Sequence, residues 1–192
     1  MNLNKMLGKI SLLVALIFPF SASSTIITID NIDAGFTSSG FVTSTASCCV
    51  GNAIGSNYMV DQVGSQGDFA IWNPTGSVDW VEGNWQVEMN WTSHANRATS
   101  ALVTIGNGLD TLFVNQKIGG GVWQNLGTYG FSALGSFVKI DDSNSVSNQY
   151  VVADAVRFTF VSAFPAQISV PAPATFLIMV LGWCGLALAK RK

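Results

Sequence analysis

The sequence predicts an all-β protein: an antiparallel β-sandwich, jelly-roll-like, flanked by an N-terminal signal helix and a C-terminal transmembrane helix. Three observations support this. Between about residues 25 and 164, short β-rich runs alternate with clusters of Gly, Asn, Asp and Ser. Residues 85–91 alternate strictly between apolar and polar. Both ends are apolar, and only 10% of the 192 residues are charged, against about 25% in a typical soluble domain.

Residues 1–23 are predicted to be a signal peptide. Lys5 and Lys9 precede an apolar run at 10–18, and Pro19 ends that run. Ser21 and Ser23 supply the small residues of a cleavage site after Ser23. Because an apolar run of about nine residues is too short to span a bilayer, we expect export by the Sec machinery and removal by signal peptidase rather than retention as an anchor.

Residues 24–165 are predicted to form the β-sandwich. Trp85, Val87, Met89 and Trp91 share one face of a half-buried strand, because alternate side chains of a strand point the same way. A second alternating run covers 156–160. Further strands are expected at 25–29, 41–45, 69–72, 101–105, 111–114 and 136–140. About 140 residues suffice for a core between two sheets.

Residues 166–192 have the composition of a membrane segment. Val170-Pro171-Ala172-Pro173 precedes an uncharged stretch, 174–189, and the chain ends in Lys190-Arg191-Lys192. As a helix, the stretch reaches about 24 Å, which is short for a span of about 30 Å. The basic tail is expected to stay in the cytoplasm, with the domain on the other side of the inner membrane. A plain tail anchor is the alternative.

Prolines before a short apolar helix with a basic stop, on a protein with a signal peptide, resemble the PEP-CTERM sorting signal of Gram-negative bacteria. That signal is processed by the membrane protease exosortase. The usual motif is Val-Pro-Glu-Pro, and this chain has Ala172 in place of the Glu. The resemblance implies cleavage near the prolines. It also implies release into an extracellular polymeric matrix or attachment to the cell surface.

Five segments of the central domain resemble the golvesin/xanthan-lyase carbohydrate-binding-like domain. They are Asp-Asn-Ile-Asp-Ala-Gly-Phe at 30–36, Asn-Arg-Ala-Thr at 96–99, Val-Asn-Gln at 114–116, Trp-Gln-Asn-Leu-Gly-Thr-Tyr at 123–129 and Ala-Asp-Ala-Val-Arg-Phe at 153–158. The resemblance implies an accessory β-sandwich that associates with glycans or surfaces and is not itself catalytic. The chain departs from the family at Cys48-Cys49-Val50-Gly51, where an aromatic-rich loop is expected.

The charge distribution argues against nucleic acid as a partner. Between residues 24 and 169, four basic residues stand against eleven acids, a net charge of −7. Nucleic-acid-binding domains are normally basic. Extracellular polysaccharide is the expected partner.

Catalysis is not expected. His94 is the only histidine, and no Gly-x-Ser-x-Gly motif supplies a nucleophile. Glu82 and Glu88 are the only glutamates, and Glu88 lies mid-strand. Two alternatives stay open: a self-assembling matrix protein without sugar affinity, and a polysaccharide hydrolase or lyase whose site the sequence does not reveal.

Asp30, Asp33 and Asp154 are candidates for a structural Ca²⁺ site, because strands from opposite chain ends often lie side by side in sandwiches. The favoured interpretation needs no metal: Asp30 and Asp33 form Asx-type turns. In that interpretation Asp154, which shares its strand parity with buried residues, pairs with Arg97 or Arg157, and Arg97 is the preferred partner. Asp141 and Asp142 are expected in a solvated turn.

Aromatic and polar side chains outside the strand faces are candidate ligand contacts. Trp85 and Trp91 are assigned to the core. Trp80 follows a turn and is expected to be the most exposed tryptophan, and Trp123 follows three glycines. The candidate contacts are Trp80, Trp123, Tyr58, Asn96 and Arg97.

Cys48 and Cys49 are adjacent in the sequence. An oxidising compartment favours a disulfide, and we expect a vicinal bridge that stiffens the loop. Two free thiols or an intermolecular bridge are the alternatives. The pair lacks the second pair of ligands that a zinc motif requires.

Overall fold

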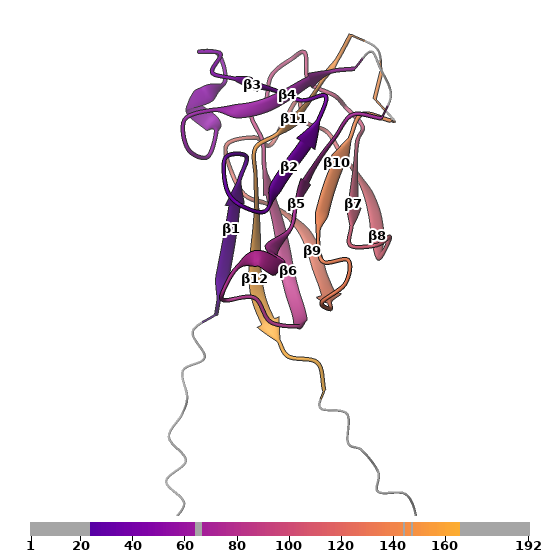
Figure 1. The fold of residues 1–192 in the computed structure, drawn as a ribbon. Coiled ribbons are helices and arrows are strands. Elements are labelled where there is room, and N and C mark those ends of the chain that lie inside the picture. The colour runs from indigo at the N-terminus through magenta and orange to yellow at the C-terminus, as the bar shows by residue number, and fades with distance from the viewer. Residues whose placement is uncertain (1–23, 64–66, 144, 147, 166–192) are drawn as a thin grey trace, which may run out of the picture.

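The computed structural model describes residues 24–63, 67–143, 145, 146 and 148–165 (Figure 1). The predicted signal peptide, residues 1–23, and the predicted sorting signal, residues 166–192, lie outside the described residues. Within the part that the structure describes, no helix is long and apolar enough to cross a membrane.

The described chain is built almost entirely of antiparallel strands in three sheets (Figure 1). One sheet has the order β1-β12-β6-β9, the second β2-β5-β10-β7-β8, and the third, a small one, β11-β4-β3. The strands are β1 (Ile26–Asp30), β2 (Phe36–Ser39), β3 (Val42–Ser44), β4 (Tyr58–Gln62), β5 (Phe69–Trp72), β6 (Gly83–Asn90), β7 (Ala101–Ile105), β8 (Asp110–Val114), β9 (Gln124–Phe131), β10 (Val138–Asp141), β11 (Tyr150–Ala153) and β12 (Ala155–Ser162). Two short 3₁₀ turns accompany them, η1 (Val50–Asn52) and η2 (Pro74–Gly76).

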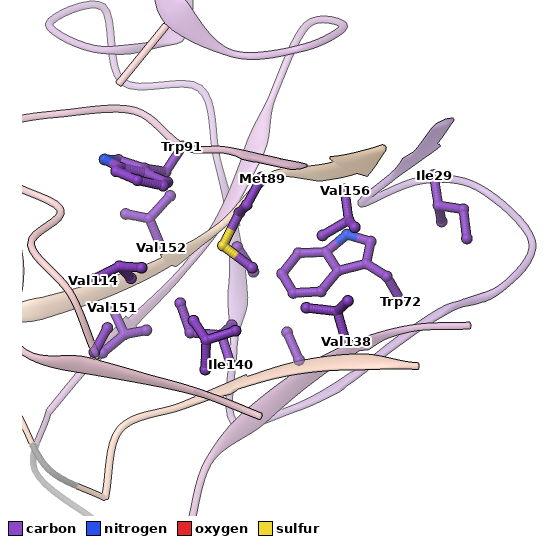
Figure 2. Close-up of a cluster of buried hydrophobic side chains, with 14 of the residues drawn as sticks. Ile29, Trp72, Met89, Trp91, Val114, Val138, Ile140, Val151, Val152 and Val156 are labelled. Carbon is purple, nitrogen blue, oxygen red and sulfur yellow. The ribbon is translucent and has the colours of Figure 1, made fainter. Parts of the chain in front are cut away.

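The first two sheets face each other across the core, as the sequence predicts. Met89 and Val156 of the four-stranded sheet lie opposite Trp72, Val138 and Ile140 of the five-stranded sheet (Figure 2). All five side chains are buried. The alternating burial of β6 confirms that it is a half-buried strand.

The small third sheet is what the sequence does not predict. Its central strand, β4, has no run of alternating apolar residues, and it carries a buried acid, Asp61. Its outer strand β11 joins β12 through the single residue Asp154, so the chain passes directly from the small sheet into the four-stranded one. Gln116 extends this sheet: its side chain both donates to Val152 O (2.7 Å) and accepts from Val152 N (2.8 Å).

The two ends of the sandwich differ in chemistry. We call the end where β12 finishes the aromatic end, because rings gather there: Trp80, Trp85, Phe131, Phe158 and Phe160. We call the opposite end, where the small sheet lies, the polar end (Figure 1). Its buried polar side chains include Asp61, Arg97, Asp142 and Asp154.

Candidate functional site

Trp123 lies on the outer face of the four-stranded sheet, just before β9, and is half-buried. The guanidinium of Arg157 lies over its ring, with Cζ 4.6 Å from the ring centroid. Glu88 holds that guanidinium through Arg157 Nη2 (2.7 Å) and Nε (2.8 Å). Arg157 is opposite Glu88 in the strand register, and Glu88 is opposite Asn125. The sheet thus presents an aromatic ring whose cationic neighbour is fixed by an ion pair.

The three glycines before Trp123 serve to dock their turn against the chain after β6. Gly121 N donates to Trp91 O at 3.0 Å, and Gly120 N donates to Ser93 Oγ at 2.6 Å. A Cβ at Gly120 would lie 2.4 Å from Trp91 O, a distance no side chain tolerates. The glycines therefore place Trp123 indirectly, by allowing this close backbone approach.

Trp80 is not the exposed platform that the sequence predicts. Its ring stacks on Trp85, with centroids 4.8 Å apart and planes at 13°. Phe131 and Phe158 contact its other sides, so Trp80 packs against the core. The backbone turn from Ser77 to Trp80 folds the ring back onto the sandwich. The assignment of Trp85 and Trp91 to the core is confirmed.

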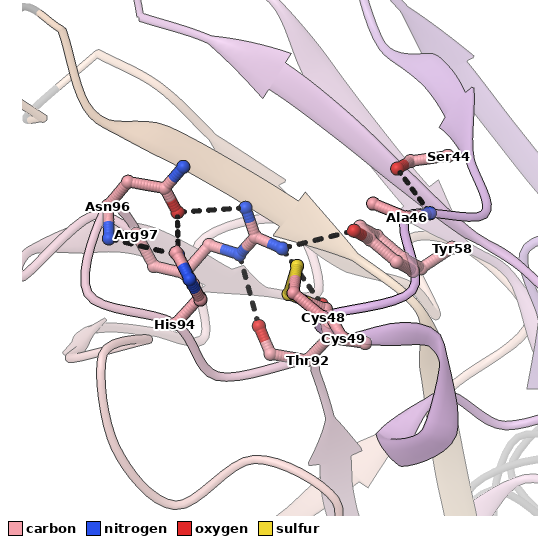
Figure 3. Close-up of a disulfide and its surroundings, with 9 residues drawn as sticks. All are labelled: Ser44, Ala46, Cys48, Cys49, Tyr58, Thr92, His94, Asn96 and Arg97. Carbon is pink, nitrogen blue, oxygen red and sulfur yellow. Dashed lines mark hydrogen bonds between the residues drawn. A yellow bond between two sulfur atoms is a disulfide. The ribbon is translucent and has the colours of Figure 1, made fainter.

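Arg97 and Tyr58 belong to a buried network at the polar end and are not surface contacts (Figure 3). Arg97 Nε donates to Thr92 O (3.1 Å), and Nη2 donates to Tyr58 Oη (3.2 Å). Nη1 donates to Asn96 Oδ1 at 3.1 Å, and Asn96 itself is exposed. The guanidinium therefore ties the 92–97 loop to β4.

The structure contains the vicinal disulfide between Cys48 and Cys49 (Figure 3). Cys49 is buried and Cys48 is exposed. His94 comes close to both sulfurs, because a ring nitrogen and the two Sγ atoms lie within 4.8 Å of one another. Its Nδ1 lies 2.8 Å from Asn96 Oδ1. No pattern in the sequence indicates this approach, which depends on the fold.

The structure brings Asp30 and Asp154 together but does not form the predicted pair between Asp154 and Arg97. Asp154 is fully buried; its Oδ2 accepts from Ile54 N at 3.1 Å, and its Oδ1 has no hydrogen-bond partner among the described residues. Burial raises the pKa of Asp154 to about 7, with the nearby Asp30 adding to the rise against the Ile54 hydrogen bond. Arg97 is committed to the network with Tyr58 and Thr92.

Asp33 acts as a turn residue, as the metal-free interpretation has it. Its Oδ2 accepts from Asp30 N at 2.9 Å, and its own N donates to Asp30 O at 3.1 Å. Asp30 Oδ1 accepts from Asn31 N at 2.8 Å. Local backbone N–H groups therefore donate hydrogen bonds to both carboxylates.

A second acidic cluster joins Asp61, Asp68 and Asp142. One carboxylate oxygen from each lies within 4.8 Å of the others. Burial, followed by the charges of Asp68 and Asp142, raises the pKa of Asp61 to about 6. The expectation of a solvated turn at 141–142 is wrong, because both side chains are buried, Asp141 beside Lys139 at 2.8 Å. Asp142 is far along the chain from Asp61 and Asp68, and the sequence carries no signal that the three carboxylates meet.

The chain is thus an all-β domain: a β-sandwich with an aromatic ring on its outer face and buried polar groups at one end. The family model of the golvesin C-terminal domain matches residues 27–160. The chain belongs to this family.

Two relatives are xanthan lyases. The chain is 36% identical over 138 residues to xanthan lyase from Bacillus sp. (strain GL1), a stretch that covers 69% of this chain and 14% of that enzyme. It is similar to the solved structure of Paenibacillus xanthan lyase, with a TM-score of 0.60 and 36% identity over 72% of this chain and 13% of the other. The chain thus spans about one seventh of the length of the curated relative.

A family 35 carbohydrate-binding module from Cellvibrio japonicus is 13% identical with a TM-score of 0.46, covering 73% of this chain and 95% of that module.

Proposed function

We propose that this protein is an exported, non-catalytic protein of the cell surface or extracellular matrix whose sandwich binds exopolysaccharide. The observation that carries the proposal is its 36% identity over 138 residues to part of an enzyme named for a polysaccharide, xanthan. The matched stretch is a small fraction of that enzyme. A glycan-contacting role is the simplest function that the two chains would share through this segment.

Trp123 is the proposed contact. Aromatic rings bind the apolar faces of sugar rings while their surroundings supply polar partners. Arg157 and Glu88 lie beside Trp123 and offer a donor fork and a carboxylate to sugar hydroxyls. The ion pair between them fixes both groups before a ligand arrives, which reduces the entropy lost on binding.

Export and sorting complete the proposal. The signal-peptide pattern of residues 1–23 implies Sec-dependent export, and Val170-Pro171-Ala172-Pro173 with Lys190-Arg191-Lys192 implies an inner-membrane intermediate that exosortase processes. The Cys48–Cys49 disulfide suits an oxidising compartment outside the cytoplasm. Cleavage near the prolines would deliver the sandwich to the surface or the matrix.

The test compares Trp123→Ala with the unaltered full chain, purified in a polyoxyethylene detergent whose headgroup contains no sugar. Affinity for xanthan and for exopolysaccharide of the producing cells is measured by affinity electrophoresis. We expect Trp123→Ala to weaken binding about tenfold, because one stacking contact is lost, while thermal stability changes little. Phe113→Ala removes an exposed ring from the other sheet and serves as the control.

Equal binding by the Trp123→Ala chain would contradict the assigned contact. If the unaltered chain binds neither polysaccharide, the alternative of a matrix protein without sugar affinity is favoured. Shortening of the polysaccharide during the assay would instead favour an enzyme.

A further inference from the structure

Three chain segments bring carboxylates to one point of the polar end. Asp61 comes from β4, Asp68 directly precedes β5, and Asp142 directly follows β10. Asp61 and Asp142 are 5% and 1% exposed. The backbone brings two of the segments into contact, because Asp142 N donates to Asp68 O at 3.3 Å. The cluster therefore joins the small sheet to the ends of β5 and β10, two neighbouring interior strands of the five-stranded sheet.

Two oxygens of this cluster lack the partner that burial demands. Asp61 Oδ2 and Asp142 Oδ2 are buried and have no hydrogen-bond partner within the described part of the chain. Asp142 Oδ1, by contrast, accepts from Gly67 N at 3.0 Å, which orients that carboxylate. Leaving ionised oxygens buried and unpaired costs several kcal/mol, and a cation is the partner that offsets this cost.

A third orphaned oxygen lies next to the cluster in the chain. Ser145 Oγ is buried without a hydrogen-bond partner among the residues that the structure describes, and Ser145 N donates to Asp142 O at 2.9 Å. Gly40 leaves room for Asp68, since a Cβ at Gly40 would lie 2.0 Å from the carboxylate carbon of Asp68. Any side chain at position 40 would displace this carboxylate.

We propose that Asp61, Asp68 and Asp142 bind a Ca²⁺ ion that joins β4, the start of β5 and the end of β10. Oxygens bound at about 2.3–2.6 Å to one Ca²⁺ lie at most about 5 Å apart, and the three carboxylate oxygens meet that limit at 4.8 Å. A donor set made only of oxygens selects a hard cation and not Zn²⁺ or Cu²⁺. Ca²⁺ also accepts the irregular geometry of ligands from three separate segments better than Mg²⁺ does.

The other acidic cluster supplies the natural comparison. Asp33 and Asp30 have backbone donors, and within the described parts of the chain Asp154 Oδ1 is the one buried oxygen of this cluster without a hydrogen-bond partner. A Ca²⁺ ion has fewer free carboxylate oxygens at that cluster, so we assign it to the cluster of Asp61.

The experiment measures the metal alone on the full chain in the sugar-free detergent, and so does not depend on glycan binding. Thermal unfolding by circular dichroism is compared in EGTA, CaCl₂ and MgCl₂, and calorimetric titration with CaCl₂ gives affinity and stoichiometry. We expect one Ca²⁺ per chain and a rise in Tm of about 5 °C at a hundredfold excess over Kd.

Asp61→Asn is expected to unfold in EGTA at the same temperature as the unaltered chain or higher, because repulsion among the acids is relieved. Its affinity for Ca²⁺ should fall at least tenfold. Asp142→Asn repeats the test if Asp61→Asn does not fold. Asp79→Asn, which removes an exposed acid, and Asp154→Asn, at the other cluster, should leave the Ca²⁺ response unchanged.

The proposal is overturned if Ca²⁺ neither raises Tm nor binds in the titration. It is also overturned if the response survives both Asp61→Asn and Asp142→Asn, or if Mg²⁺ stabilises the chain as much as Ca²⁺ does.

Discussion

The aromatic end and the polar end close the same sandwich by opposite means. At the aromatic end, Trp85 is fully buried between the Trp80 ring at 4.8 Å and the Phe160 ring at 5.1 Å. Its one polar atom, Nε1, donates to Val81 O at 3.0 Å. At the polar end, the groups excluded from water are the guanidinium of Arg97 and several carboxylates.

This difference separates the region that contributes most of the stability from the region whose stability responds to pH and ions. Packed rings gain free energy from apolar burial and from ring geometry, neither of which depends on pH or ions. The free energy of burying a charge depends on its partners, because a buried charge that lacks a partner loses more free energy of hydration than its remaining hydrogen bonds supply. We therefore expect substitutions at the aromatic end to cost the most stability, and conditions in solution to act mainly through the polar end.

Trp85→Ala should have the largest effect. It removes the centre of the ring cluster and leaves a cavity that neighbouring strands fill only in part, so we expect the free energy of unfolding to fall by about 3–5 kcal/mol. Urea unfolding followed by circular dichroism measures the loss. Trp123→Ala, which truncates a half-buried ring on the sheet's outer face, is the control. If both variants lose the same free energy, the aromatic end is not the main source of stability.

Arg97→Lys tests the polar end with its charge retained. The ammonium of lysine cannot reproduce the fork that reaches Thr92, Tyr58 and Asn96, so some acceptors are left unpaired. We expect a loss of about 2–3 kcal/mol in the same urea experiment. Asn96→Ala removes only an exposed acceptor of this network and should cost less than about 1 kcal/mol. A negligible effect of Arg97→Lys would show that the network adds no stability.

The sequence predicts the strands whose apolar residues either alternate with polar ones or form a short continuous apolar run. The predicted strand at 85–91 and the one at 156–160 correspond to β6 and β12, and the predicted strands at 69–72 and 101–105 have the same bounds as β5 and β7. These strands bury one face against a core, so the pattern of their residues indicates their place in the fold. β4 and β9 carry an acid or glycines where apolar residues would be expected.

The polar contacts were harder to predict, because each depends on where a loop finishes. Strand parity correctly places Asp154 inside, yet it does not reveal that Arg97 turns toward Tyr58. Trp80 is in a turn by its sequence, but no local pattern shows that the turn folds onto Trp85. The cluster of Asp61 and Asp142 requires the third sheet, which the alternation rule does not detect.

Asp154→Asn sharpens the comparison through pH. In the folded protein, Asp154 has a pKa of about 7, raised from an ordinary 3.8 by burial. The folded chain therefore keeps this proton up to about pH 7, whereas the unfolded chain releases it near pH 4. Because the folded state binds more protons in that range, the contribution of Asp154 to stability falls as pH rises from 4 to 7 and stays low above.

Asparagine keeps the shape and never ionises, so it removes this dependence. Relative to the unaltered chain, Asp154→Asn should gain about 2 kcal/mol in free energy of unfolding between pH 5 and pH 8. Urea unfolding at the two pH values measures the gain, and Asp79→Asn, at an exposed acid, should show none. A gain of equal size at both pH values would mean that Asp154 carries the same charge in the folded and unfolded chain. The buried carboxylate would then have a partner cation, and the polar end would be as insensitive to pH as the aromatic end.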